Sequence, residues 1–262
     1  MTPQIGVIGL FMEALQEDYE GTMQRMADMG IQGVEMGDYS LGKLPVPLPD
    51  FKRKLDDLGM KLACHTSANA LADRFKEILA TCELFECKYV SFMYGPCESV
   101  DQILQDAERY EKLGAQCRER GLTLCYHNHD HELRRFDGKH GLDILMENTA
   151  PKHLQGHFDV AWLTFGGVQP AEFIRKYEGR CPLLHMKDLV RLEPGCETAS
   201  GDRKQAQFTE VGTGIVDVTG VVEAAREIGT EWLSVEQDRM RQLSRIESLA
   251  VSVANLRSVL YG

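Results

Sequence analysis

The sequence lacks the features that mark secreted and membrane-bound proteins. Its eight cysteines are scattered and never form a Cys-x-x-Cys pair, so neither a disulfide framework nor a zinc ribbon is indicated. No segment has the roughly 18 consecutive apolar residues of a membrane span. The start, Met1 to Gln4, lacks the basic and then apolar pattern of a signal peptide. We therefore expect a cytoplasmic protein without membrane contact, whose cysteines are mostly reduced and buried.

Two further ligand classes lack support. Positive charge is scarce, because 29 Lys and Arg residues face 40 Asp and Glu residues and leave a net charge of -11. Such a surface repels a phosphate backbone unless its basic groups gather on one face, so nucleic acid is not an expected partner. The first apolar segment does not lead into a Gly-x-Gly-x-x-Gly turn, so a dinucleotide-binding fold loses its main support.

What the sequence does have is a repeated alternation of short apolar segments and amphipathic helical ones. Four helical segments end on glycine, at Gly30, Gly59, Gly121 and Gly229, which favours a left-handed C-cap. The helical segments, in which apolar positions recur at three and four residues, include 15–29, 50–58, 71–86, 99–120 and 240–260. The eight strand candidates are Ile5–Leu10, Gly33–Met36, Lys61–His65, Tyr89–Met93, Leu122–His127, Gln155–Asp159, Pro182–Lys187 and Trp232–Glu236.

This alternation predicts an α/β fold with a parallel sheet. Eight strand-helix units in 262 residues favour a closed barrel over an open sheet. We therefore expect one domain over residues 1–262, a (β/α)8 TIM barrel with a parallel, eight-stranded closed sheet. The polar stretch 191–209 is expected to be an insertion after the seventh strand that lies over the site.

Function in such a barrel sits where the strands end. The fifth strand ends in His127 and leads to His129, the sixth ends in Asp159, the seventh contains His185 and the eighth ends in Glu236. Because side chains alternate across a strand, His127, His185 and Glu236 are expected to point into the barrel while their apolar neighbours face the helices. Carboxylates and imidazoles together predict one divalent ion, such as Mn, Mg, Co or Zn, in an open catalytic site.

Simpler interpretations of these residues remain open. A strand-end Asp or Glu often caps the next helix or meets a surface lysine, and the histidine-rich run 127–131 is also compatible with a solvated loop. Recurrence of such groups at the same end of four consecutive strands favours the metal site.

Five segments, in order along the chain, carry a resemblance to a known family. With them the sequence resembles the sugar phosphate isomerase/epimerase family of xylose isomerase-like TIM barrels, and the match covers essentially the whole chain. That superfamily also contains ketose 3-epimerases, inosose dehydratases, hydroxypyruvate isomerases and endonuclease IV, so the resemblance does not determine one reaction. The segments are Tyr126-His127-Asn128-His129-x-x-Glu132, Phe158-Asp159-Val160-x-Trp162, His185-Met186-Lys187-Asp188, Glu210-Val211-Gly212-x-Gly214-Ile215-x-Asp217 and Val235-Glu236-Gln237-Asp238.

The resemblance implies a metal held by Asp159, His185, Glu236 and one residue of the fifth-strand region. Many relatives have a glutamate where this chain has His127, whereas Glu132 follows slightly later in the loop. We predict Glu132 as the fourth ligand, because it retains three carboxylates and one histidine. His127 and His129 would then be free to contact substrate.

Further residues are predicted to contact substrate. Trp162 stands where the epimerase relatives have a histidine and suits the wall of a sugar-binding pocket. Lys187 points the same way as His185 and would bind an anionic group or polarise a carbonyl, with a salt bridge to Asp159 or Glu236 as the alternative. Three others are placed at the mouth with a structural role left open for each: Arg191, Glu35 and His65.

The chemistry common to such sites is removal of a proton next to a carbonyl. Glu132 and Glu236 are candidate bases, and His127 and His129 are candidate proton carriers near neutral pH. We predict an isomerase or epimerase acting on a small sugar or polyol, with a lyase, dehydratase or hydrolase as the alternative. A non-catalytic sugar-binding barrel is a further reading. The sequence does not determine which sugar is bound, whether it is phosphorylated or which ion is native. It is compatible with a homo-oligomer but does not determine the oligomeric state.

Overall fold

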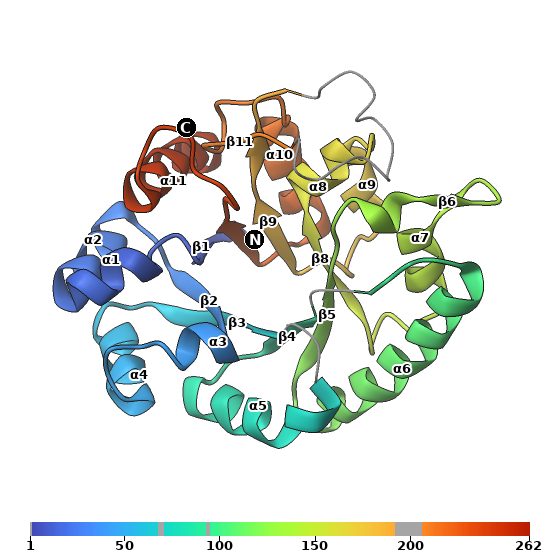
Figure 1. The fold of residues 1–262 in the computed structure, drawn as a ribbon, viewed down its shortest axis with the longest axis horizontal. Coiled ribbons are helices and arrows are strands. Elements are labelled where there is room, and N and C mark those ends of the chain that lie inside the picture. Colours follow the sequence, from blue (N-terminus) through green and yellow to red (C-terminus); the bar gives the residue numbers. More distant parts are fainter. Residues whose placement is uncertain (1, 68–70, 93–94, 192–205) are drawn as a thin grey trace.

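Eight parallel strands close into a barrel in the computed structural model, which describes residues 2–67, 71–92, 95–191 and 206–262 (Figure 1). Around the barrel the strands follow the order β1-β12-β9-β8-β5-β4-β3-β2. The predicted TIM barrel is therefore confirmed, and each predicted strand is present, although Met93 lies outside the described residues. The strands are β1 (Gln4–Ile8), β2 (Gly33–Gly37), β3 (Lys61–Ser67), β4 (Tyr89–Phe92), β5 (Thr123–His127), β8 (Gln155–Asp159), β9 (Leu183–Met186) and β12 (Trp232–Val235).

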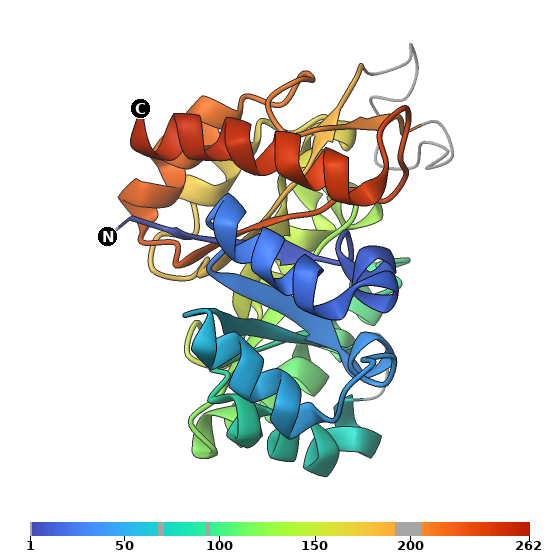
Figure 2. The ribbon, with the colours of Figure 1, turned by 90° about the vertical axis from the view of Figure 1, so that its left-hand side faces the viewer.

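Helices surround the barrel, and the last of them, α11, lies beside α2 so that the two ends of the chain complete the ring (Figure 2). Two short hairpins, β6 (Arg135–Phe136) with β7 (Lys139–His140) and β10 (Asp188–Leu189) with β11 (Phe208–Thr209), lie outside the barrel. The helices are α1 (Met12–Glu17), α2 (Tyr19–Met29), α3 (Asp38–Leu41), α4 (Leu48–Asp57), α5 (Leu71–Phe85), α6 (Val100–Glu119), η1 (His131–Leu133), α7 (Gly141–Glu147), α8 (Val160–Phe165), α9 (Pro170–Arg175), α10 (Val218–Ile228) and α11 (Arg245–Tyr261).

The helical segments agree with the prediction, except that the first is divided into two helices and the last begins later than expected. The segment 15–29 is two helices, because the Asp18 side chain caps α2 by accepting a hydrogen bond of 2.9 Å from the Gly21 N–H. The last helix starts at Arg245, where Ser244 and Glu247 form a capping box. All four predicted glycines have left-handed backbone conformations, with φ of 86° at Gly30, 67° at Gly59, 75° at Gly121 and 81° at Gly229.

Two apolar layers lie on the two sides of the barrel wall. The larger one lies between strands and helices and contains Leu124, Leu184 and Leu233, while a small one inside the barrel contains Cys125 and Trp232. This is the predicted alternation of the fifth, seventh and eighth strands. The seven cysteines in the described part of the chain are buried and free, as expected.

A bulge in β3 changes which of its side chains face inward. Val34 pairs with Leu62, but the next residue, Glu35, pairs with Cys64, so that Ala63 is skipped. Cys64 therefore joins the inner layer. His65 pairs with Met36 and so turns to the helix side of the sheet.

The segment predicted to cover the site is only partly described, because residues 192–205 of 191–209 lie outside the described residues. Its flanks pair in the β10–β11 hairpin. Next to that hairpin the Asp188 carboxylate accepts hydrogen bonds from the backbone N–H groups of Gly212, Gly214 and Val216, at 2.9–3.0 Å. Asp188 thereby holds the 210–217 segment at the carboxyl end of β9.

Within the described ranges, every helix is too short or too polar to cross a membrane.

Candidate metal centre

Four polar side chains converge at the carboxyl ends of four neighbouring strands. His127 ends β5, Asp159 ends β8, His185 lies in β9, and Glu236 directly follows β12. Each offers one ligand atom, and these four atoms lie within 4.8 Å of one another. The parallel barrel produces this arrangement, because it brings the carboxyl ends of strands distant in sequence to one rim.

The four residues hold buried polar atoms that have no hydrogen bond of acceptable geometry. These atoms are Nδ1 of His127, Oδ2 of Asp159, Nδ1 of His185 and Oε2 of Glu236. Buried polar groups without hydrogen bonds are rare. The nearest partners of three of these atoms are charged groups of the site itself, Lys187 for the two carboxylate oxygens and Glu236 for His185 Nδ1. Four such atoms in one place, two imidazole nitrogens and two carboxylate oxygens, fit a divalent cation.

The ammonium group of Lys187, which is almost completely buried, lies against the carboxylates of this group. Its Nζ lies 3.0 Å from Asp159 Oδ2, 2.8 Å from Glu236 Oε2 and 3.0 Å from Asp238 Oδ2. The salt bridge considered as the alternative role of Lys187 is thus present. It supplies one positive charge against three carboxylates.

Burial and charge act in opposite directions on the pKa values of the site. Burial disfavours the imidazolium of His185, but Glu236 and Glu35 more than offset this and raise its pKa to about 10. Burial lowers the pKa of His127 well below its usual value, so this imidazole is neutral. Burial raises the pKa of Asp159 to about 6 against the opposing effect of Lys187. The pKa of Glu236 is held well below its usual value, because Lys187 and His185 outweigh its burial.

Glu132 lies in a neighbouring cluster with His129 and His131 and is not part of the four-residue group. Its Oε1 accepts a hydrogen bond from the Tyr126 hydroxyl, and its Oε2 accepts one from the backbone N–H of His129, both at 2.9 Å. The short helix η1 turns Glu132 back against β5. In the structure it is His127, and not Glu132, that lies in one group with Asp159, His185 and Glu236.

His129 lies between His127 and Trp162 and contacts the rings of both. The ring centroids of His129 and Trp162 are 5.8 Å apart, and those of His129 and His127 are 5.0 Å apart. The Trp162 ring also lies 5.6 Å from Lys187 Nζ and packs against Phe208. Trp162 is thus close enough to serve as a wall of a substrate pocket, although only 5% of it is exposed.

Of the three residues predicted at the mouth, Glu35 and His65 are buried and Arg191 is exposed. Glu35 is buried beneath His185, 3.0 Å from its Nε2. His65 faces the helices because of the bulge, and its Nε2 is 3.4 Å from Asp38 Oδ1. Arg191 is exposed at the edge of the described residues. Glu35 and His65 thus lack the exposed surface that a contact with substrate needs.

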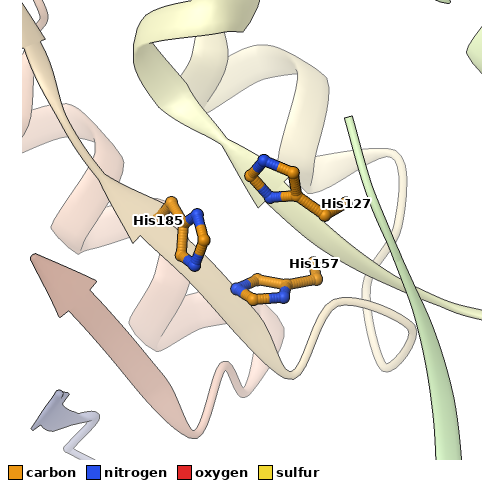
Figure 3. Close-up of side chains that lie close together, drawn as sticks. All are labelled: His127, His157 and His185. Carbon is orange, nitrogen blue, oxygen red and sulfur yellow. The ribbon is translucent and has the colours of Figure 1, made fainter. Parts of the chain in front are cut away.

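Sequence reasoning did not select His157, although it lies in the same layer. The rings of His127, His157 and His185 lie together inside the barrel, with centroids 4.1–5.3 Å apart (Figure 3). The signal was present: His157 stands two residues before Asp159 on β8, so alternation places both on the inner face. Asp238 was missed in the same way, two residues after Glu236.

Fold and site together define a TIM barrel with a candidate metal centre at the carboxyl ends of its strands. The model of the xylose isomerase-like TIM barrel family matches residues 23–259, and the chain belongs to this family. The family named from the sequence motifs is thereby confirmed.

Known proteins similar to this chain include sugar enzymes. Inosose dehydratase from Geobacillus kaustophilus is 28% identical over 253 residues, which are 83% of this chain and 79% of the relative. A sugar phosphate isomerase/epimerase from Parabacteroides distasonis has a similar structure, with a TM-score of 0.78, 18% identity and coverage of 99% of this chain and 96% of the other. IOLI protein, solved with a zinc atom bound, has a TM-score of 0.76 with 16% identity and 98% coverage of each chain.

Several curated relatives match over only part of their length. For the first of them, another inosose dehydratase, the match covers 135 residues, 49% of this chain and 45% of the relative. The similarity to known proteins therefore establishes the family. The reaction has to be inferred from the residues of the site.

Proposed function

We propose that the protein is a divalent-metal-dependent isomerase or epimerase that moves a proton next to a carbonyl group of a small sugar or polyol-derived substrate. The observation that supports this proposal best is the convergence of two imidazoles and two carboxylates, His127, Asp159, His185 and Glu236, whose ligand atoms lie within 4.8 Å of one another. A barrel that only bound sugars would have no need to gather two imidazoles and two carboxylates in one group that Lys187 neutralises only in part.

We assign the ion to Asp159, His185, Glu236 and His127, with Glu132 as the rival for the fourth place. Two imidazoles and two carboxylates suit zinc, cobalt or manganese better than magnesium, which prefers oxygen ligands. When bound, such an ion polarises the oxygen atoms of a substrate and offsets the negative charge that develops on them.

The side chains around this position can bind the substrate and move its proton. Lys187 holds a proton at Nζ and can stabilise negative charge on a substrate oxygen. His129 lies between the metal position and Trp162, where an imidazole can carry a proton to and from a substrate carbon. Glu132 supports this arrangement by fixing the backbone N–H of His129. Trp162 would pack against the apolar face of a sugar ring.

A dehydratase is the second candidate, because the curated relatives are inosose dehydratases. The same proton removal, followed by expulsion of a neighbouring hydroxyl group in place of reprotonation, gives dehydration. Both reactions start from the same residues, so they differ in the product and not in the first step.

Exchange with heavy water tests the shared first step. We expect protein reloaded with zinc, manganese or cobalt to incorporate deuterium next to the carbonyl of at least one member of a panel of ketoses and keto-polyols, as measured by NMR. Protein stripped with a chelator and the Asp159→Ala variant serve as controls. A stereoisomer as product supports the isomerase or epimerase, and loss of water supports the dehydratase. No exchange with any ion and any substrate of the panel would contradict both.

Metal affinity is expected to depend strongly on pH. With its pKa of about 10, His185 is protonated at neutral pH without the ion, and a cation must displace that proton before it binds. Raising the pH favours the neutral imidazole, so affinity should rise by about tenfold per pH unit between pH 6 and 8 if one proton is released. Competition with a chelator of known affinity measures this slope. Affinity that stayed constant over this range would show that His185 is neutral before the ion binds.

A further inference from the structure

The geometry points to Glu35 as a positioning residue, one that holds His185 so that its Nδ1 faces the metal position. This inference rests on the proposed function, because it presumes that His185 binds an ion. It differs from the role in substrate binding that the sequence suggested for Glu35.

The two nitrogens of His185 face two different carboxylates. Nε2 lies 3.0 Å from Glu35 Oε2, inside the barrel, whereas Nδ1 lies 2.8 Å from Glu236 Oε2, on the side of the ligand group. Only the Nε2 contact has hydrogen-bond geometry, whereas Nδ1 makes no hydrogen bond of acceptable geometry. Because a carboxylate can only accept a hydrogen bond, Nε2 carries the hydrogen of the bond to Glu35. The neutral ring then has its lone pair on Nδ1, which is the nitrogen that faces the metal position.

Glu35 is itself held from several sides. The Ser234 hydroxyl donates to its Oε1, and His157 Nε2 lies 3.5 Å from the same oxygen. His157 is fixed in turn through its Nδ1, 2.8 Å from the Ser91 hydroxyl. All these groups are buried, and they come from β2, β12, β8 and β4. The Glu35 carboxylate therefore has little freedom to turn away from His185.

A role in positioning explains why a carboxylate lies beneath the site without access to solvent. Glu35 has almost no surface available to a substrate, since only 1% of the residue is exposed. In metal sites, a carboxylate that accepts a hydrogen bond from a ligating histidine fixes the ring orientation and its tautomer. Removing such a partner commonly costs 10–100-fold in metal affinity.

The test compares zinc affinity in the full-length wild type, Glu35→Gln and Glu35→Asp, by competition with a chelator. Glutamine keeps the size and loses the charge, whereas aspartate keeps the charge and withdraws it from His185. We expect both variants to bind zinc roughly 10–100-fold more weakly than the wild type. Ser234→Ala, which removes a donor to Glu35 and leaves the contact with His185, is the matched control and should change affinity much less.

A second measurement separates positioning from a general effect on folding. In zinc-loaded protein labelled with ¹⁵N-histidine, the His185 ring should show its hydrogen on Nε2 in the wild type, and this signal should shift or broaden in the Glu35 variants. Unchanged zinc affinity in both variants, or a hydrogen on Nδ1 in the wild type, would overturn the inference while leaving the metal site intact.

Two other outcomes are informative. Two zinc ions per wild-type chain, with one lost on Cys64→Ser, would mean that Glu35 is a ligand together with Cys64 and His157, and would overturn its role in positioning. Absence of any bound ion in the wild type would remove the proposed function and this inference together.

Discussion

Replacement of Asp159, His185 or Glu236 by alanine is expected to remove the ion and abolish metal-dependent activity. A site with four protein ligands contributes roughly 10–16 kcal/mol of binding free energy for zinc. One ligand in four then accounts for roughly 2.5–4 kcal/mol, so affinity should fall by about 100-fold or more. Elemental analysis after dialysis, followed by the deuterium exchange assay, measures both effects.

The fold should survive these three changes. The apolar core between the barrel and the helices does not include these side chains, and Lys187 keeps at least two carboxylate partners when either Asp159 or Glu236 is removed. His153→Ala is a matched control, because His153 contacts Glu111 and precedes the amino end of β8, whereas Asp159 lies at the carboxyl end, so this change should leave the ion bound. Full metal occupancy in all three site variants would disprove the assignment.

The second large effect concerns the fourth ligand. We expect His127→Asn to lose most of its metal affinity, because His127 Nδ1 is one of the four atoms that converge without hydrogen bonds. Glu132→Gln should keep the ion, since the Glu132 carboxylate already accepts hydrogen bonds from Tyr126 and the backbone of His129. The Glu132 variant should instead lower kcat, because the loop that carries His129 loses an anchor.

Measured side by side, these variants decide between two arrangements of one site. The opposite pattern, with metal lost from Glu132→Gln and kept in His127→Asn, would show that η1 rearranges when the ion binds and that Glu132 is the ligand. The native ion bears on the same choice. Two imidazoles favour zinc or cobalt, whereas a third carboxylate in place of His127 would favour manganese or magnesium.

Alternation along single strands could be predicted, because it depends only on local backbone geometry. The inward positions of His127, His185 and Glu236 follow from the apolar neighbours that face the helices. At His65 the bulge at Ala63 reverses the alternation, so that His65 takes the structural role that the sequence had left open. Nothing in the apolar pattern of Lys61 to His65 reveals a bulge.

The sequence by itself determined the order of strands and helices, the closed parallel barrel, the family and three members of the candidate metal group. These follow from periodicity and from motifs that are local in the chain. Only the tertiary structure placed His127 with Asp159, His185 and Glu236, turned Glu132 aside and set Glu35 beneath His185. Those contacts depend on the register between strands and on one short turn after β5, which join residues as many as 150 positions apart. Local conformational preference cannot specify contacts between residues so far apart in the chain. Those contacts form only when the barrel closes.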